Sequence, residues 1–88
     1  MKIELVGPLR RIMDVSEIEL EVNERTMLVE VLNRLPEKVK KHVLKSVDTV
    51  SPQIMILVNG VEVKSIGIEK VYVEDKDKVV LIPIIHGG

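Results

Sequence analysis

The chain has 88 residues, of which 45% are hydrophobic and 31% are charged. This length allows one compact domain and excludes a catalytic domain joined to a regulatory one. Thirteen basic and 14 acidic side chains leave a formal net charge of −1, and Tyr72 is the only aromatic residue. The chain therefore lacks the overall positive charge and the aromatic platforms typical of nucleic-acid binding.

Cysteine and long apolar segments are both missing from the sequence. The absence of cysteine excludes a disulfide scaffold, a cysteine-ligated metal site and a thiol nucleophile. The longest apolar runs, residues 54–58 and 79–82, fall far short of the roughly 20 residues that a membrane span needs. The N-terminus shows no signal-peptide core, so we expect a cytoplasmic protein without membrane contact.

Residues 2–5 and 17–22 alternate apolar and charged side chains, which predicts two strands with one buried face each. A Gly-Pro pair ends the first strand. Residues 9–16 are expected to connect the two strands, with Leu9, Ile12 and Met13 packed under the sheet edge.

Two helices are predicted next. Thr26 stands at an N-cap position, and apolar residues follow with helical spacing, which predicts a main helix over residues 27–35. Pro36 suits the first position of a second, short helix. That helix carries four lysines, Lys38, Lys40, Lys41 and Lys45, together with His42. A solvated helix face explains this cluster most simply, and docking of an acidic partner is the alternative.

The second half of the chain predicts a hairpin and a central strand. Residues 54–58 are all apolar, Asn59-Gly60 follows, and residues 61–64 alternate, which is a strong hairpin signal. After a charged turn, residues 79–82 form a strand with no polar face, as expected in the middle of a sheet.

These elements assemble if the last strand lies beside the first, in parallel, with the helices across one face. The result is an α+β protein of the β-grasp type, with a mixed sheet of four to five strands, one main helix and a second short helix. Because strand residues alternate between faces, Met55 and Leu57 are expected either to form an apolar docking face on the helix-free side or to lie beneath the connecting loops.

No constellation for independent catalysis is present, and the two histidines lie on different elements. Asp75 and Asp77 lie two residues apart in a lysine-rich turn, where ordinary solvation of the turn explains them. We therefore expect no metal site and no enzyme that acts alone.

The chain ends in Pro83, Ile84, Ile85, His86, Gly87 and Gly88. We expect residues 1–82 to form the domain and residues 83–88 a flexible tail that reaches roughly 20 Å beyond the sheet. Two glycines make a thin strip that a narrow tunnel can admit, and Gly88 presents an unhindered carboxylate. A carboxylate is a poor electrophile, so its plausible activation is attack on ATP to give an acyl-adenylate.

The Val58-Asn59-Gly60 hairpin, the charged turn at residues 74–78 and the Gly-Gly ending resemble the sulfur-carrier branch of ubiquitin-like proteins. The resemblance covers nearly the whole chain and is greatest to the small subunit of molybdopterin synthase and the small archaeal modifiers. Three residues depart from the pattern. The family usually has an aromatic residue where Ile82 stands, glycine where Lys76 stands and a small residue where His86 stands.

The resemblance implies that a ubiquitin-activating-type enzyme adenylates Gly88 with ATP. The product would be a C-terminal thiocarboxylate that donates sulfur to a pterin precursor in the large synthase subunit, for molybdenum cofactor biosynthesis. Alternatively, the same adenylate would lead to an isopeptide bond with a target lysine. A third possibility is a β-grasp interaction module whose glycines have no function.

Overall fold

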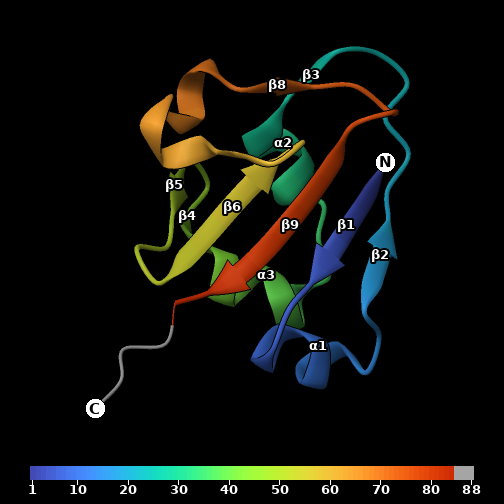
Figure 1. Cartoon of the computed structure of the whole chain (residues 1–88), viewed down its shortest axis with the longest axis vertical. Coiled ribbons are helices and arrows are strands. Elements are labelled where there is room, and N and C mark those ends of the chain that lie inside the picture. The colour runs from blue at the N-terminus through green and yellow to red at the C-terminus, as the bar shows by residue number, and fades with distance from the viewer. Residues whose placement is uncertain (85–88) are drawn as a thin grey trace.

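The structure, a computed structural model, describes residues 1–84 of the chain. Its main sheet has five strands in the order β2-β1-β9-β6-β7 (Figure 1). These strands are β1 (Lys2–Leu5), β2 (Glu17–Glu19), β6 (Ile54–Val58), β7 (Val61–Glu62) and β9 (Lys78–Pro83). The apolar β9 lies in the centre, parallel to β1 and antiparallel to β6. The predicted central strand and its parallel neighbour are confirmed.

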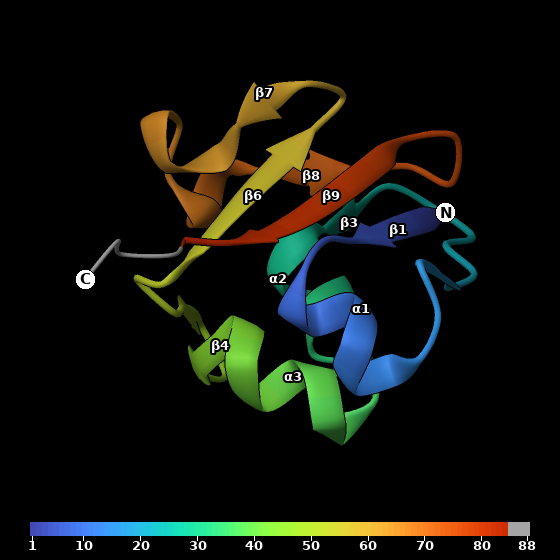
Figure 2. The same ribbon diagram turned by 60° about the horizontal axis from the view of Figure 1, so that its bottom comes forward.

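Three helices, α1 (Pro8–Met13), α2 (Leu28–Leu32) and α3 (Glu37–Val43), lie on one face of this sheet (Figure 2). The first of them was predicted only as a connection. Pro8 opens α1 at a position where its missing N–H costs nothing. Leu9 is buried as expected, but Ile12 is 37% exposed, so its predicted packing is wrong.

The start of α2 differs from the prediction. Met27 occupies the N-cap, and the Thr26 hydroxyl instead donates a hydrogen bond to the Glu24 carbonyl at 2.7 Å. Thr26 belongs to β3 (Thr26–Met27), which pairs with β8 (Tyr72–Val73). Regular helix ends at Leu32, but tighter turns continue the chain so that Leu35 is still buried.

Pro36 is the N-cap of α3, with an extended ψ of 142°, and the helix begins one residue later than predicted. Val39 and Val43 are fully buried. After Val43 the chain turns into a small ribbon of β4 (Leu44–Ser46) and β5 (Thr49–Val50).

The hairpin of β6 and β7 is confirmed, with positive φ at Asn59 (49°) and Gly60 (84°), as a type I′ turn requires. The second strand ends at Glu62, two residues earlier than predicted, because Val63 enters the core and starts a 3₁₀ turn, η1 (Val63–Ser65). A further turn, η2 (Ile68–Lys70), leads to β8.

The core lies between the sheet and the helices. Its fully buried side chains include Ile3, Leu5, Val79 and Leu81 from the sheet and Leu28, Val31, Leu32, Val39 and Val43 from the helices. This is the predicted α+β, β-grasp arrangement. Over residues 1–84, none of the helices has the length and apolar character to cross a membrane.

Candidate functional site

The C-terminal strand leaves the middle of the sheet, where neighbours hold it on both sides. Pro83 pairs with Ile54, and the Ile84 N–H donates a hydrogen bond to the Gln53 carbonyl at 2.8 Å. β9 thus extends one residue past the expected domain boundary at residue 82. The segment that follows Ile84 therefore starts from a fixed point, which we call the C-terminal root.

Four of the predicted site residues, Ile85, His86, Gly87 and Gly88, lie outside the described residues. The role of the Gly88 carboxylate and the division of the chain into residues 1–82 and 83–88 therefore stay predictions. Pro83 and Ile84 are both half-buried at the root.

The face of the sheet opposite the helices presents an apolar strip. Met55 pairs with Ile82 across the sheet, and Leu57 pairs with Val80. All four side chains are half-buried, whereas the residues between them, such as Ile56 and Leu81, are buried against the helices. We call these four residues the open face. Their alternation is as expected, and partner binding there stays a prediction.

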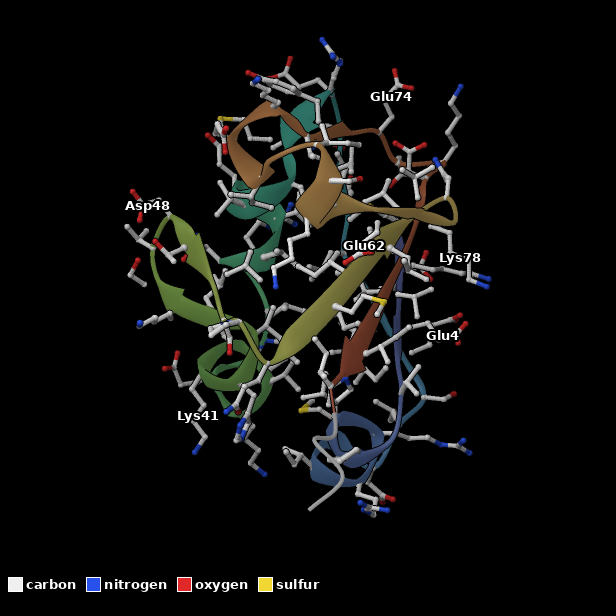
Figure 3. The ribbon with its side chains drawn as sticks, turned by 60° about the vertical axis from the view of Figure 1, so that its left-hand side comes forward. Glu4, Lys41, Asp48, Glu62, Glu74 and Lys78 are labelled. Carbon is white, nitrogen blue, oxygen red and sulfur yellow. The ribbon has the colours of Figure 1, made fainter. Side chains whose placement is uncertain are left out.

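Charged side chains border the open face. The Lys78 ammonium lies 3.2 Å from the Glu4 carboxylate, and Glu62 lies opposite Leu57 on β7. Figure 3 shows Glu4, Glu62 and Lys78 on the same side of the sheet. Such an apolar strip with a polar rim is the usual anatomy of a protein-binding surface.

A groove of about 410 Å³ adjoins the C-terminal root. Its apolar lining includes Val50, Ile54, Met55, Val63, Ile68 and Ile84. Residues from the β4–β5 ribbon, β6, η1 and η2 meet there, so the sequence order gives no signal for it.

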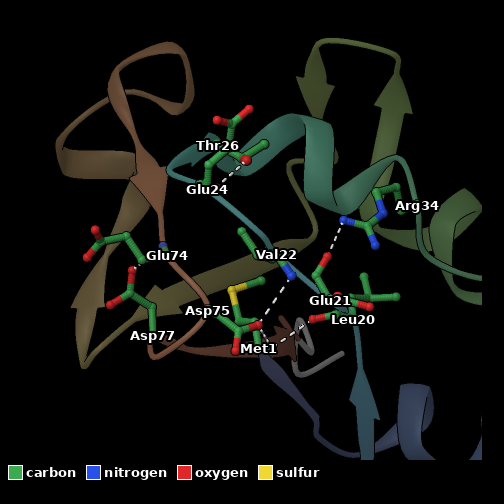
Figure 4. A network of polar contacts seen from close by, with 10 residues as sticks. All are labelled: Met1, Leu20, Glu21, Val22, Glu24, Thr26, Arg34, Glu74, Asp75 and Asp77. Carbon is green, nitrogen blue, oxygen red and sulfur yellow. Dashed lines mark hydrogen bonds and ion pairs between the residues drawn. The ribbon is translucent and has the colours of Figure 1, made fainter.

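Asp75 fastens the N-terminus to the charged turn (Figure 4). The Met1 ammonium donates hydrogen bonds to Asp75 Oδ1 at 2.8 Å and to the Leu20 carbonyl at 2.7 Å. The Val22 N–H also donates to Asp75 Oδ1, at 3.2 Å. The hydrogen bond from the ammonium is the main reason that the pKa of Asp75 is lowered.

Asp77 joins the same turn to the β6–β7 hairpin. It accepts hydrogen bonds from the Asn59 amide at 3.0 Å and from the Glu74 N–H at 2.7 Å. The Asn59 hydrogen bond is the largest cause of the lowered pKa of Asp77. Each carboxylate thus has its own structural partners, and residues 1–84 contain no group of three potential metal ligands.

The lysine cluster lies on α3 and β4. Lys38, Lys41, Lys45 and His42 are exposed, and Lys40 is half-buried with its ammonium 3.5 Å from Glu37. The predicted surface position of His42 is confirmed.

A central C-terminal strand in a mixed sheet, with helices on one face and an apolar open face on the other, defines a β-grasp protein of the ubiquitin-like class. The family model for Urm1 (ubiquitin related modifier) matches residues 1–88, and the chain belongs to this family. A ubiquitin-related modifier 1 homolog from Dictyostelium discoideum is 34% identical over 96 residues, covering 100% of this chain and 98% of the relative.

Solved structures agree with this assignment. Urm1 from Sulfolobus solfataricus has a TM-score of 0.72 at 29% identity, over 96% of this chain and 100% of its own. SAMP1 from Haloferax volcanii has a TM-score of 0.82 at 18% identity, over 100% of this chain and 98% of its own. The second likeness concerns the fold alone.

Proposed function

We propose that this chain is a carrier protein whose C-terminal Gly88 is activated as an acyl-adenylate and converted to a thiocarboxylate. A carboxylate oxygen attacks the α-phosphorus of ATP and pyrophosphate leaves. A sulfur nucleophile then attacks the carbonyl carbon and displaces AMP, which leaves sulfur in place of one oxygen. ATP is consumed by the activating enzyme, and the chain itself is substrate and carrier, not catalyst.

One observation carries this proposal: a member of the ubiquitin-related modifier family holds its last strand in the centre of the sheet and ends in Gly-Gly. Because neighbouring strands fix β9, docking of the folded body also positions the start of the C-terminal segment. A defined starting point lowers the entropic cost of placing the carboxylate at a partner's reactive centre.

The open face supplies the docking surface in this proposal. Met55 and Leu57 extend the apolar surface that continues through Ile82 towards the root. The adenylating enzyme covers this face while the segment that follows Ile84 enters its active site.

For the thiocarboxylate, we propose sulfur donation to a pterin precursor in the large subunit of molybdopterin synthase. The family description as a modifier favours a second fate for the same adenylate, an isopeptide bond to a target lysine. The two fates differ only in the nucleophile that receives the acyl group.

The direct test incubates the protein with a ubiquitin-activating-type enzyme from the same organism, ATP and a sulfide donor. Intact-mass spectrometry should detect exchange of one C-terminal oxygen for sulfur, together with release of pyrophosphate. Gly87→Val should fail in this assay, because a β-branched residue widens the strip and restricts its backbone, and yet it should melt like the parent. Unchanged activity after deletion of Gly87 and Gly88 would refute the carrier and modifier functions together.

Two further assays separate the fates. Addition of the large synthase subunit and a pterin precursor should consume the thiocarboxylate if the chain donates sulfur there. Addition of lysine-containing acceptor proteins, followed by peptide mass spectrometry, should reveal isopeptide-linked Gly88 if it is a modifier.

A further inference from the structure

Charge is strongly segregated on this nearly neutral chain. Residues 38–45 contain four lysines and no acidic residue, whereas residues 14–24 contain five acidic residues and no basic one. Within residues 1–84, Lys40 is the one member of the lysine cluster that forms an ion pair, with Glu37. We call the exposed members of the cluster, Lys38, Lys41 and Lys45, the basic surface.

The basic surface has a rigid base. Val39 and Val43, on the inner side of α3, are fully buried in the core. The helix is therefore held in place by packing, and a partner would not have to order it on binding. Figure 3 shows Lys41 extending away from the body of the protein.

A short path of hydrogen bonds connects the basic surface to the C-terminal root. The Ser51 N–H donates to the Val43 carbonyl at 2.8 Å, at the end of α3. The Gln53 N–H donates to the Ser51 hydroxyl at 3.2 Å, and the Gln53 carbonyl accepts from Ile84 at 2.8 Å. The end of the basic helix is thus tied to the point from which the C-terminal segment departs.

We infer that the basic surface docks an acidic surface on the protein that receives the C-terminal segment, beside the entrance for that segment. The inference rests on the proposed function, because the adenylating enzyme is that receiving protein. With a net charge of −1 the chain has no global field to steer association. A local cluster can supply such steering, because complementary charges act over about one Debye length, roughly 8 Å at physiological salt.

A protein partner fits the surface better than RNA does. Single-stranded RNA is usually held by stacking on aromatic rings as well as by positive charge. Tyr72, the only Tyr, Phe or Trp residue, belongs to β8 and lies 4.5 Å from the Arg25 guanidinium carbon, so within residues 1–84 the small His42 imidazole is the one ring that the basic surface offers for stacking.

The test compares two double variants with the same change in net charge. Lys38→Glu with Lys41→Glu reverses the basic surface, and Lys64→Glu with Lys70→Glu is the matched control at exposed positions elsewhere, which like Lys38 and Lys41 form no ion pair within residues 1–84. Association with the adenylating enzyme of the same organism is followed by stopped flow at low and physiological salt. Adenylation is measured over a range of carrier concentrations.

We expect the first variant to associate about tenfold or more slowly at low salt, with the difference shrinking as salt rises. Its kcat should be unchanged and its KM raised, because the surface does not touch the reacting atoms. The control should behave like the parent. Equal effects of both variants, or no effect of either, would overturn the inference.

Two alternative partners of the basic surface, RNA and a second copy of this chain, would give different results. Binding of bulk transfer RNA by the parent, lost in the first variant while enzyme association is kept, would overturn the inference in favour of RNA. A salt-sensitive dimer in sedimentation, lost in the first variant with enzyme association intact, would overturn it in favour of a second copy.

If the enzyme does not adenylate the parent protein, the proposed function fails. If it does and the charge reversal has no effect, only the inference about the basic surface fails.

Discussion

Adjacent residues of β9 test the assignment of the two sheet faces. Leu81 is fully buried against the helices, whereas Val80 is half-buried on the open face. Leu81→Ala should cost about 2–5 kcal/mol, because it leaves a cavity in the core. A domain of this size has a free energy of unfolding on the order of 4–13 kcal/mol, so this loss is a large share of the total. Val80→Ala removes two methyl groups that are half-buried, which at about 0.8 kcal/mol per fully buried group gives roughly 0.8 kcal/mol.

The stability of both variants is measured by thermal and urea unfolding, with circular dichroism as the signal. At about 4–8 °C per kcal/mol for a domain of this size, Tm should fall by roughly 8 °C or more for Leu81→Ala and by about 3–6 °C for Val80→Ala. Binding to the adenylating enzyme, measured well below both Tm values, should weaken for Val80→Ala. A loss of stability as large for Val80→Ala as for Leu81→Ala would show that the open face is covered, and docking on it would be refuted.

The central strand and the hairpin could be predicted because their signals are local. A strand with apolar side chains on both faces needs neighbours on both sides, and β9 has them. Asn59 and Gly60 are the residues that tolerate the positive φ angles of the turn. The alternation along β6 likewise placed Met55 and Leu57 on the same face.

The remaining elements depend on contacts between distant segments. α1 has six residues and buries only Leu9, so it leaves almost no helical periodicity in the sequence. Thr26 has the chemistry of an N-cap, but β3 pairs with β8 and the Leu28 N–H bonds to the Val71 carbonyl at 2.9 Å. A tertiary partner thus replaces the local cap.

The chemistry proposed for the C-terminus could be predicted from the residue types alone. The position of the surfaces around it could be found only from the fold. The lysines of α3 are adjacent in sequence, which shows a charge cluster but not where it lies. Their relation to the C-terminal root follows from the contacts of Val43, Ser51 and Gln53. The apolar groove could likewise not be predicted, because its lining comes from segments far apart in the sequence that meet beside Ile84.

The other predictions concern the turns that connect these surfaces. Gly60→Ala should cost about 1 kcal/mol, or about 4–8 °C in Tm, because its φ of +84° is strained for a residue with a side chain. No steric clash adds to this cost, since the new methyl group meets no other atom. An unchanged Tm would contradict the left-handed geometry. Asp75→Asn should lower Tm at neutral pH by removing the ion pair with the Met1 ammonium. The pKa of Asp75 lies below its usual value of 3.8 in the folded state, so its stabilising effect is complete above that pH and is lost as the pH falls through the lower, folded pKa. The difference in Tm between Asp75→Asn and the parent should therefore be constant from pH 7 to about pH 5 and close in stronger acid. Glu24→Gln, at an exposed position, is the control and should show no such difference. A gap for Asp75→Asn that persists unchanged below the folded pKa would show that the ion pair is not its cause.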